Sequence, residues 1–172
     1  MSGRAAWAAA VVVLAGCSTP DVATPDDVET PAVVATLDCG GSIQAIAHPL
    51  DPSEWSIAAG SAAFVSGPPV ERGRDGPADS AVDGLQFAKF GLAVREGTDV
   101  TLTAQDGPHR ALLGWGTDEP ARQLDYSGCP GEGDRWLVFA GGLWVPDADC
   151  YAIEVRAGSE AEMLMVGVDH PC

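Results

Sequence analysis

Apolar and polar residues alternate with a period of two over much of the chain. Tyr151, Ile153 and Val155 are separated by small or charged residues, and the segment Val100–Ala104 has the same alternation. Side chains of a strand point alternately to its two faces, so this pattern is typical of strands with one buried face. No stretch of twelve or more residues after the N-terminal segment has the 3.6-residue period of an amphipathic helix.

Other segments are apolar at consecutive positions. Residues 136–140 and 163–168 are apolar at both odd and even positions, which point to opposite faces of a strand. This predicts strands that are covered on both faces. Weaker strand candidates lie at residues 43–47, 55–58, 62–66 and 111–115. Turn-forming residues separate these segments at 96–97, 106–108, 141–142 and 157–158.

One strand candidate changes parity part-way along. Phe90, Leu92 and Val94 alternate with less apolar residues, whereas Leu85 and Phe87 just before them have the opposite parity. A β-bulge near residues 88–89 would produce this slip. Taken together, the pattern predicts an all-β, immunoglobulin-like antiparallel sandwich of about eight or nine short strands.

The first residues of the chain form an export signal. Arg4 precedes an apolar run of 11 residues at 5–15, too short to span a bilayer core of about 30 Å as a helix. The run ends in Leu14-Ala15-Gly16-Cys17, which resembles the lipobox of bacterial lipoproteins. We therefore predict a signal peptide at residues 1–16, cleavage before Cys17, and a diacylglyceryl group on its thiol.

This reading places the protein at the extracytoplasmic face of a bacterial cell membrane. Two acyl chains anchor stably where one is marginal, since each buried methylene contributes about 0.8 kcal/mol. The alternative is an ordinary secretory signal that ends at a cysteine by chance.

A tether and one domain follow the signal. Residues 17–38 contain three Thr-Pro pairs, several acidic residues and no basic residue, which predicts an extended, solvated spacer. Residues 39–172 are left for a single β-sandwich domain, which is long enough to bury a substantial core.

Charge excludes one class of partner. The chain has 9 basic and 25 acidic residues and a formal net charge of −16; loss of Arg4 with the signal leaves 8 basic and 25 acidic residues, or −17. Nucleic-acid binding requires clustered positive charge, so we expect no nucleic-acid partner. Anionic lipid headgroups would repel such a chain, so we expect it to be linked to the membrane covalently, through the lipid on Cys17.

Four cysteines remain after Cys17, and an oxidising compartment favours disulfides. Of the three possible pairings we favour Cys39–Cys172, which would join the two ends of the domain, together with Cys129–Cys150. Metal binding is the rival interpretation, but no two of these cysteines have the close spacing of a zinc site.

The segment from Trp136 to Val155, WLVFAGGLWVPDADCYAIEV, resembles the end of small secreted bacterial domains. These are chiefly actinobacterial lipoproteins of unknown function, in which a closing strand ends near a cysteine. The resemblance implies an immunoglobulin-like sandwich. It implies no catalytic residues, because that family has no assigned chemistry.

Chemical motifs are sparse. His48, His109 and His170 all adjoin prolines and are expected in turns, and no serine lies in a Gly-x-Ser-x-Gly motif. We predict no catalytic residue, metal site or cofactor. A Ca²⁺ site in the acidic loop, which carries carboxylates at Asp75, Asp79 and Asp83, is the weaker alternative to a solvated loop.

Two tryptophans are weak candidates for ligand binding. Trp115 lies between two glycines, and Trp144 has the opposite parity from its apolar neighbours. Aromatic rings beside glycines can serve as stacking platforms, although core packing is the commoner role.

The sequence therefore favours a non-catalytic, membrane-anchored surface module with a binding or structural role in the cell envelope. The alternatives are an extracytoplasmic hydrolase with scattered catalytic residues and a lipoprotein that binds a small ligand or metal.

Overall fold

The computed structural model describes residues 34–47, 55–65, 69–73, 82, 84–105, 111–116, 119–131, 133 and 135–172. The chain divides into two compact units, Met1–Thr30 and Pro31–Cys172, and every described residue belongs to the second. This second unit contains all the described strands and their core, so it has what a domain needs to fold independently. No helix among the described residues has the length and apolar character needed to cross a membrane.

The described residues form thirteen strands and one short 3₁₀ helix. The elements are β1 (Val34–Thr36), η1 (Cys39–Gly41), β2 (Gln44–Ile46), β3 (Trp55–Ala58), β4 (Ala62–Val65), β5 (Gln86–Lys89), β6 (Leu92–Arg95), β7 (Val100–Ala104), β8 (Leu112–Trp115), β9 (Gln123–Tyr126), β10 (Trp136–Phe139), β11 (Gly141–Val145), β12 (Cys150–Ala157) and β13 (Glu160–Gly167).

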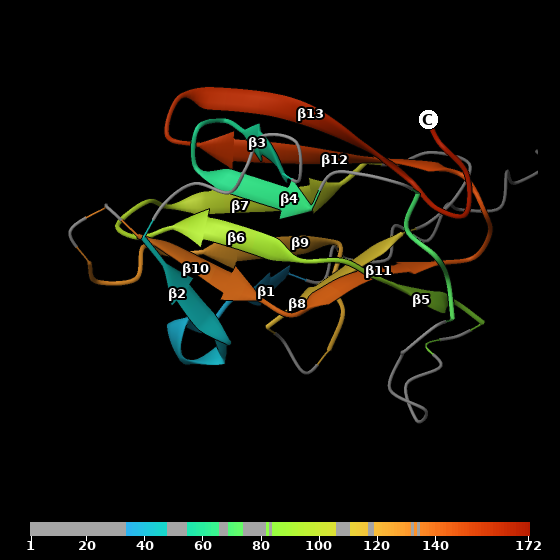
Figure 1. The fold of residues 1–172 in the computed structure, drawn as a ribbon, viewed down its shortest axis with the longest axis horizontal. Coiled ribbons are helices and arrows are strands. Elements are labelled where there is room, and N and C mark those ends of the chain that lie inside the picture. Colours follow the sequence, from blue (N-terminus) through green and yellow to red (C-terminus); the bar gives the residue numbers. More distant parts are fainter. Residues whose placement is uncertain are drawn as a thin grey trace, which may run out of the picture. The chain divides into compact units, whose positions relative to one another are not determined.

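These strands make three sheets (Figure 1). Sheet A has the order β1-β9-β7-β12-β13, sheet B the order β2-β10-β6-β4-β3, and the three-stranded sheet the order β5-β11-β8. Every pairing between these strands is antiparallel except that of β1 with β9.

Sheet B and the three-stranded sheet are joined by an uninterrupted register. Lys89 on β5 pairs with Gly142 on β11, and Leu92 on β6 pairs with Phe139 on β10, so both pairs follow the same alignment. Between them the Phe90 N–H donates to the Gly141 carbonyl at 3.0 Å. The two sheets are thus one bent layer, and sheet A is the other layer of the sandwich.

The predicted bulge near residues 88–89 is wrong, because this register accommodates no extra residue. Ala88, Phe90 and Leu92 are all buried in the main core, so the inward parity is constant through the bend. Phe87 lies on the opposite face, where its ring centre is 5.0 Å from that of Trp144. The sequence pattern changed parity because an outward aromatic pair preceded the inward apolar series.

Trp115 lies in the main hydrophobic core, which draws residues from all three sheets. Its ring centre is 5.8 Å from that of Phe64 and 4.9 Å from that of Phe90, both edge-on. Its indole Nε1–H donates to the Phe90 carbonyl at 2.8 Å, so the buried polar atom is satisfied. The predicted all-β sandwich is confirmed.

There are more strands than the eight or nine expected, partly because residues 141–142 form no turn. β11 begins there, and a side chain on either glycine would collide with a neighbouring backbone: that of Gly114 or Trp115 for Gly141, and that of Ala88 for Gly142. These glycines permit close approach of strands instead of reversing the chain.

The domain starts earlier than residue 39. β1 lies inside the predicted tether, and Leu37 just after it is 2% exposed in the core, with its N–H donating to the Asp125 carbonyl at 2.9 Å. The end of the predicted spacer is therefore wrong, because residues 34–36 pair with β9 and Leu37 is buried in the core.

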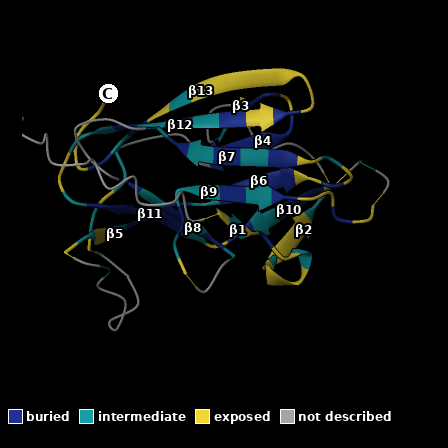
Figure 2. Cartoon of the chain, turned by 180° about the vertical axis from the view of Figure 1, so that it is seen from behind, coloured by how far each residue is buried: buried dark blue, intermediate teal, exposed yellow. Residues whose placement is uncertain are grey.

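The strand expected at residues 163–168 was predicted to be covered on both faces, and this is also wrong. β13 forms one edge of sheet A and is exposed at five of its first six positions, Glu160 to Met163 and Met165. Figure 2 shows it exposed along most of its length.

Candidate functional site

The predicted lipidation site, Cys17, lies outside the described residues, and so do other residues that were weighed as weaker candidates, namely His48, His109, Asp75, Asp79 and Asp83. His170 is described: it is exposed, with Nδ1 3.0 Å from the Pro171 carbonyl oxygen. Among the residues that the structure describes, no group of three or more His, Cys, Asp or Glu side chains is placed to hold a metal ion.

All four cysteines of the domain form disulfides, but the favoured pairing is wrong. The bonds are Cys39–Cys129, with Cα atoms 5.7 Å apart, and Cys150–Cys172, with Cα atoms 5.6 Å apart. The two ends of the domain are not bonded to each other, because each has a nearer partner. The N-terminal end follows β1 alongside β9, which leads into Cys129, whereas the C-terminal end follows β13 alongside β12, which begins at Cys150.

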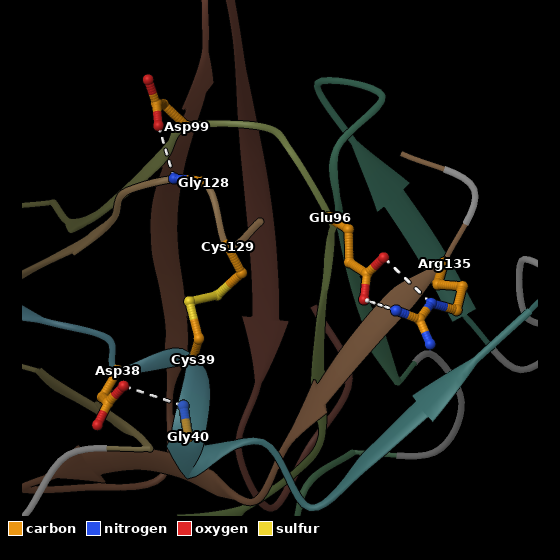
Figure 3. Close-up of a disulfide and its surroundings, with 8 residues drawn as sticks. All are labelled: Asp38, Cys39, Gly40, Glu96, Asp99, Gly128, Cys129 and Arg135. Atoms are coloured by element: carbon orange, nitrogen blue, oxygen red, sulfur yellow. Dashed lines mark hydrogen bonds and ion pairs between the residues drawn. A yellow bond between two sulfur atoms is a disulfide. The ribbon is translucent and has the colours of Figure 1, made fainter. Parts of the chain in front are cut away.

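The loop after β9, described at residues 127–131, is held in place by bonds around Cys129 (Figure 3). The Gly97 N–H donates to the Cys129 carbonyl at 3.0 Å, and the Gly128 N–H donates to Asp99 Oδ1 at 2.6 Å. On the other side of the disulfide, Asp38 Oδ1 accepts the Gly40 N–H at 2.9 Å and so caps η1. These bonds hold both cysteines in position.

Glu96 is a buried carboxylate next to this loop. Its side chain is 4% exposed and accepts from Arg135 through Nε at 3.1 Å and Nη2 at 3.0 Å, whereas Arg135 remains largely exposed. A Cβ on Gly131 would collide with the Glu96 carboxylate, so the loop closes over it only because residue 131 is glycine. This bidentate ion pair links the turn after β6, which contains Glu96, to the residue that precedes β10.

Tyr126 lies beneath the same loop. Its side chain is buried, and its hydroxyl faces the Cys129 backbone without a hydrogen bond of good geometry. Burial raises the pKa of the phenol above its usual 10.0.

Neither candidate tryptophan offers a stacking platform. Trp115 is fully buried, and Trp144 is 7% exposed. Trp144 packs against Phe87, and the Cβ position of Gly114 lies 3.1 Å from its Nε1. The glycine beside Trp115 thus makes room for the indole of Trp144 from the neighbouring strand.

Along its outer edge, β13 has backbone groups that no other described strand pairs with. The Val168 N–H donates to the Asp149 carbonyl at 3.0 Å, so the pair of these two residues is hydrogen-bonded. Hydrogen-bonded pairs alternate along an antiparallel ladder, and the next such pair is Val166 with Tyr151. It follows that Ala161, Met163 and Met165 direct their N–H and C=O groups away from β12, toward the free edge.

One end of this edge is already covered. The Val70 N–H donates to the Gly167 carbonyl at 3.0 Å, and the Asp169 N–H donates to the Val70 carbonyl at 2.8 Å. Asp169 also accepts from the Arg72 backbone and guanidinium, and these hydrogen bonds lower the pKa of its carboxyl below 3.8. No described strand pairs with the remaining edge, Glu160 to Val166.

The side chains of β13 differ between its two faces. Met163 and Met165 point to the outer face of sheet A and are 50% and 52% exposed. Glu160 and Glu162 are on the same parity as the buried Val166, but they lie beyond the core near the β3–β4 turn.

The sequence interpretation overlooked these four residues, although two glutamates on the core-facing parity are a signal of an edge strand.

A second apolar surface lies on the outer face of sheet B. Ala63, Ala93 and Trp136 form a small buried cluster there, separate from the main core, and partly buried Ile46, Trp55 and Val138 surround it. None of the described residues on this face indicates the chemistry of a ligand.

A comparison of the sequence with protein-family models found no match, and neither did a comparison with curated proteins.

Proposed function

We propose that this chain is a lipid-anchored extracytoplasmic protein whose non-catalytic β-sandwich binds a protein partner along β13. The observation that carries the proposal is the edge from Glu160 to Val166, which no described strand covers and which also carries two half-exposed methionines. Methionine packs adaptably and is enriched in binding surfaces, and an unpaired strand edge is a template for pairing with another chain.

The anchor is the other half of the proposal. The lipobox-like sequence supports lipidation of Cys17, and the spacer between Cys17 and β1 would hold the sandwich away from the membrane. The resemblance of the segment from Trp136 to Val155 to secreted actinobacterial lipoproteins supports the same location.

Position-specific crosslinking in cells tests the binding surface. A photoreactive phenylalanine analogue would replace Met163 in one variant and Val34 in a matched control. Both residues are 50% exposed, and they occupy the same row of sheet A at its opposite edges. We expect a discrete crosslinked product from position 163 and none from position 34. Identical products from both positions, or none from either, would reject β13 as the binding surface.

The anchor needs a separate test. The mature N-terminus should carry a diacylglyceryl-modified Cys17 by mass spectrometry, and Cys17→Ser should move the protein out of the membrane fraction. An unmodified Cys17 in the native protein would refute the anchor while leaving the crosslinking result intact.

A further inference from the structure

We infer that the partner of β13 is an extended segment in which basic and apolar residues alternate, and that it adds to sheet A as a further strand. This inference rests on the proposed function and specifies its partner. It combines three observations: the direction of the backbone groups, the segregation of side chains on the two faces, and the charge of the chain.

The backbone determines the shape of the partner. Ala161, Met163 and Met165 offer three N–H donors and three C=O acceptors at the edge, spaced as in a strand. Only an extended chain can pair with all of them, so the partner is a strand-like segment and not a helix.

The side chains determine its pattern. Residues of an added strand lie on the same face as the β13 residues opposite them and alternate between faces. On one face they would meet Met163 and Met165, and on the other Glu160 and Glu162, followed by the less exposed Leu164 and Val166. Apolar residues suit the first face, and lysine or arginine suits the part of the second face that holds the glutamates.

Charge separates this partner from a second copy of the chain. The chain carries a net charge of −16, so two copies repel each other. Antiparallel self-pairing centred on Met163 would place Glu162 of one copy opposite Leu164 of the other, with the two Glu162 side chains on adjacent diagonal positions. Like charges at such positions are unfavourable, so the glutamates oppose self-association and favour a basic strand.

The end of the edge limits where the partner can bind. Val70 occupies the position beside Val168, and the sequence before it is Pro68-Pro69. A proline has no N–H to donate to a ladder. The available edge is therefore the run from Glu160 to Val166, the length of a typical strand.

The test is amide hydrogen exchange, with the unit from Pro31 to Cys172 and synthetic peptides. The probe is Lys-Val-Lys-Val-Lys-Val-Lys with blocked ends. Its controls are Glu-Val-Glu-Val-Glu-Val-Glu and a block-ordered peptide with the lysines and valines of the probe. We expect the probe to slow exchange at Ala161, Met163 and Met165 at least tenfold at saturation, and neither control to do so.

Two variants check the mode of binding. Met163→Pro removes an outward donor that β12 does not use, and we expect at least tenfold weaker binding of the probe with strand pairing to β12 retained. Glu160→Lys should weaken binding about threefold and make it less dependent on salt. The matched control Val34→Pro, at the opposite edge of sheet A, should leave binding unchanged.

Equal protection by the block-ordered peptide would mean that charge alone acts, and equal protection by the glutamate peptide would remove the charge argument. Protection that increases with protein concentration without peptide would identify a second copy as the occupant. Each of these results overturns the inference. If position 163 still gives its specific crosslink, the proposed function stands and only the partner chemistry is wrong.

Discussion

The Glu162 carboxylate on β13 accepts a hydrogen bond from the backbone N–H of Ala59 at 2.8 Å. Ala59 belongs to the turn between β3 and β4 and has φ 47°, a left-handed conformation that is unusual for alanine. One side chain thus connects the edge strands of sheets A and B. It also satisfies the N–H of a strained turn residue.

Removal of this acceptor should weaken that edge of the sandwich. We expect Glu162→Ala to lower the free energy of unfolding by about 1 kcal/mol, because the Ala59 N–H loses its partner. Glu162→Gln keeps an acceptor oxygen and should cost less than half as much. Urea unfolding of the two variants measures the difference, and equal losses would show that the charge and not the hydrogen bond matters.

The two disulfides should differ in their contribution to stability. The cysteines of Cys39–Cys129 are 90 residues apart and those of Cys150–Cys172 are 22 apart. Loop-closure entropy predicts losses of about 4.6 and 3.4 kcal/mol when the paired cysteines are replaced by serine. Denaturant unfolding of the variants Cys39→Ser/Cys129→Ser and Cys150→Ser/Cys172→Ser tests the order. Non-reducing peptide mapping of the wild type checks the pairing itself, and a Cys39–Cys172 linked peptide would contradict it.

The two buried tyrosines form a matched pair for hydroxyl deletion. The Tyr151 hydroxyl donates to the Asp147 carbonyl at 2.8 Å, whereas the Tyr126 hydroxyl has no hydrogen-bond partner of good geometry among the described residues. We expect Tyr151→Phe to cost about 1 kcal/mol and Tyr126→Phe to be neutral or slightly stabilising. A loss of more than 1 kcal/mol in Tyr126→Phe would reveal a hydrogen bond to the Cys129 loop.

The same tyrosines should make the fold sensitive to alkali. Burial is the main cause that raises the pKa of both phenols above 10.0. A folded-state pKa above the unfolded value means that stability is fully present below pH 10 and is lost as the pH rises through the folded pKa values. Thermal unfolding between pH 8 and about pH 12 should show this loss, and Tyr126→Phe should reduce it. An unchanged alkaline profile in that variant would exclude Tyr126 as a contributor.

Protonation of the Asp169 carboxyl in acid should release residues 69–73 from β13. Hydrogen bonds from Arg72 lower the pKa of its carboxyl below 3.8, so the contact is complete above this pH and is lost as the pH falls through the folded-state pKa. The amide signals of Val70 and Arg72 should shift over that range in NMR spectra. Asp169→Asn lacks the titrating group, and persistence of the same shift in it would assign the transition elsewhere.

The alternation along the chain was sufficient to predict the sandwich and its best strands. Tyr151, Ile153 and Val155 are buried as predicted, because the period of two reports directly which face is buried. Phe87 departs from this rule, because its apolar side chain faces outward onto Trp144. Periodicity does not distinguish a core face from an outer face that holds its own aromatic pair.

The disulfide partners and the candidate site depend on sheet order, which alternation does not contain. Cys39 reaches Cys129 because β1 pairs with β9, and neither of these strands stood out in the sequence. Met163 and Met165 are exposed because β13 lies at an edge. Their apolar run was indistinguishable from that of a central strand until the neighbouring strands were known.

The early position of the Cys39–Cys129 bond has a mechanical consequence. A pull on the chain from its N-terminal side would reach β1 first and could peel away only residues 34–38 before it met a covalent link. From there the load would enter the loop after β9, which is itself fastened to the β6–β7 turn. In a protein attached through a segment at that end, this arrangement would let the sandwich bear tension without unfolding from its point of attachment.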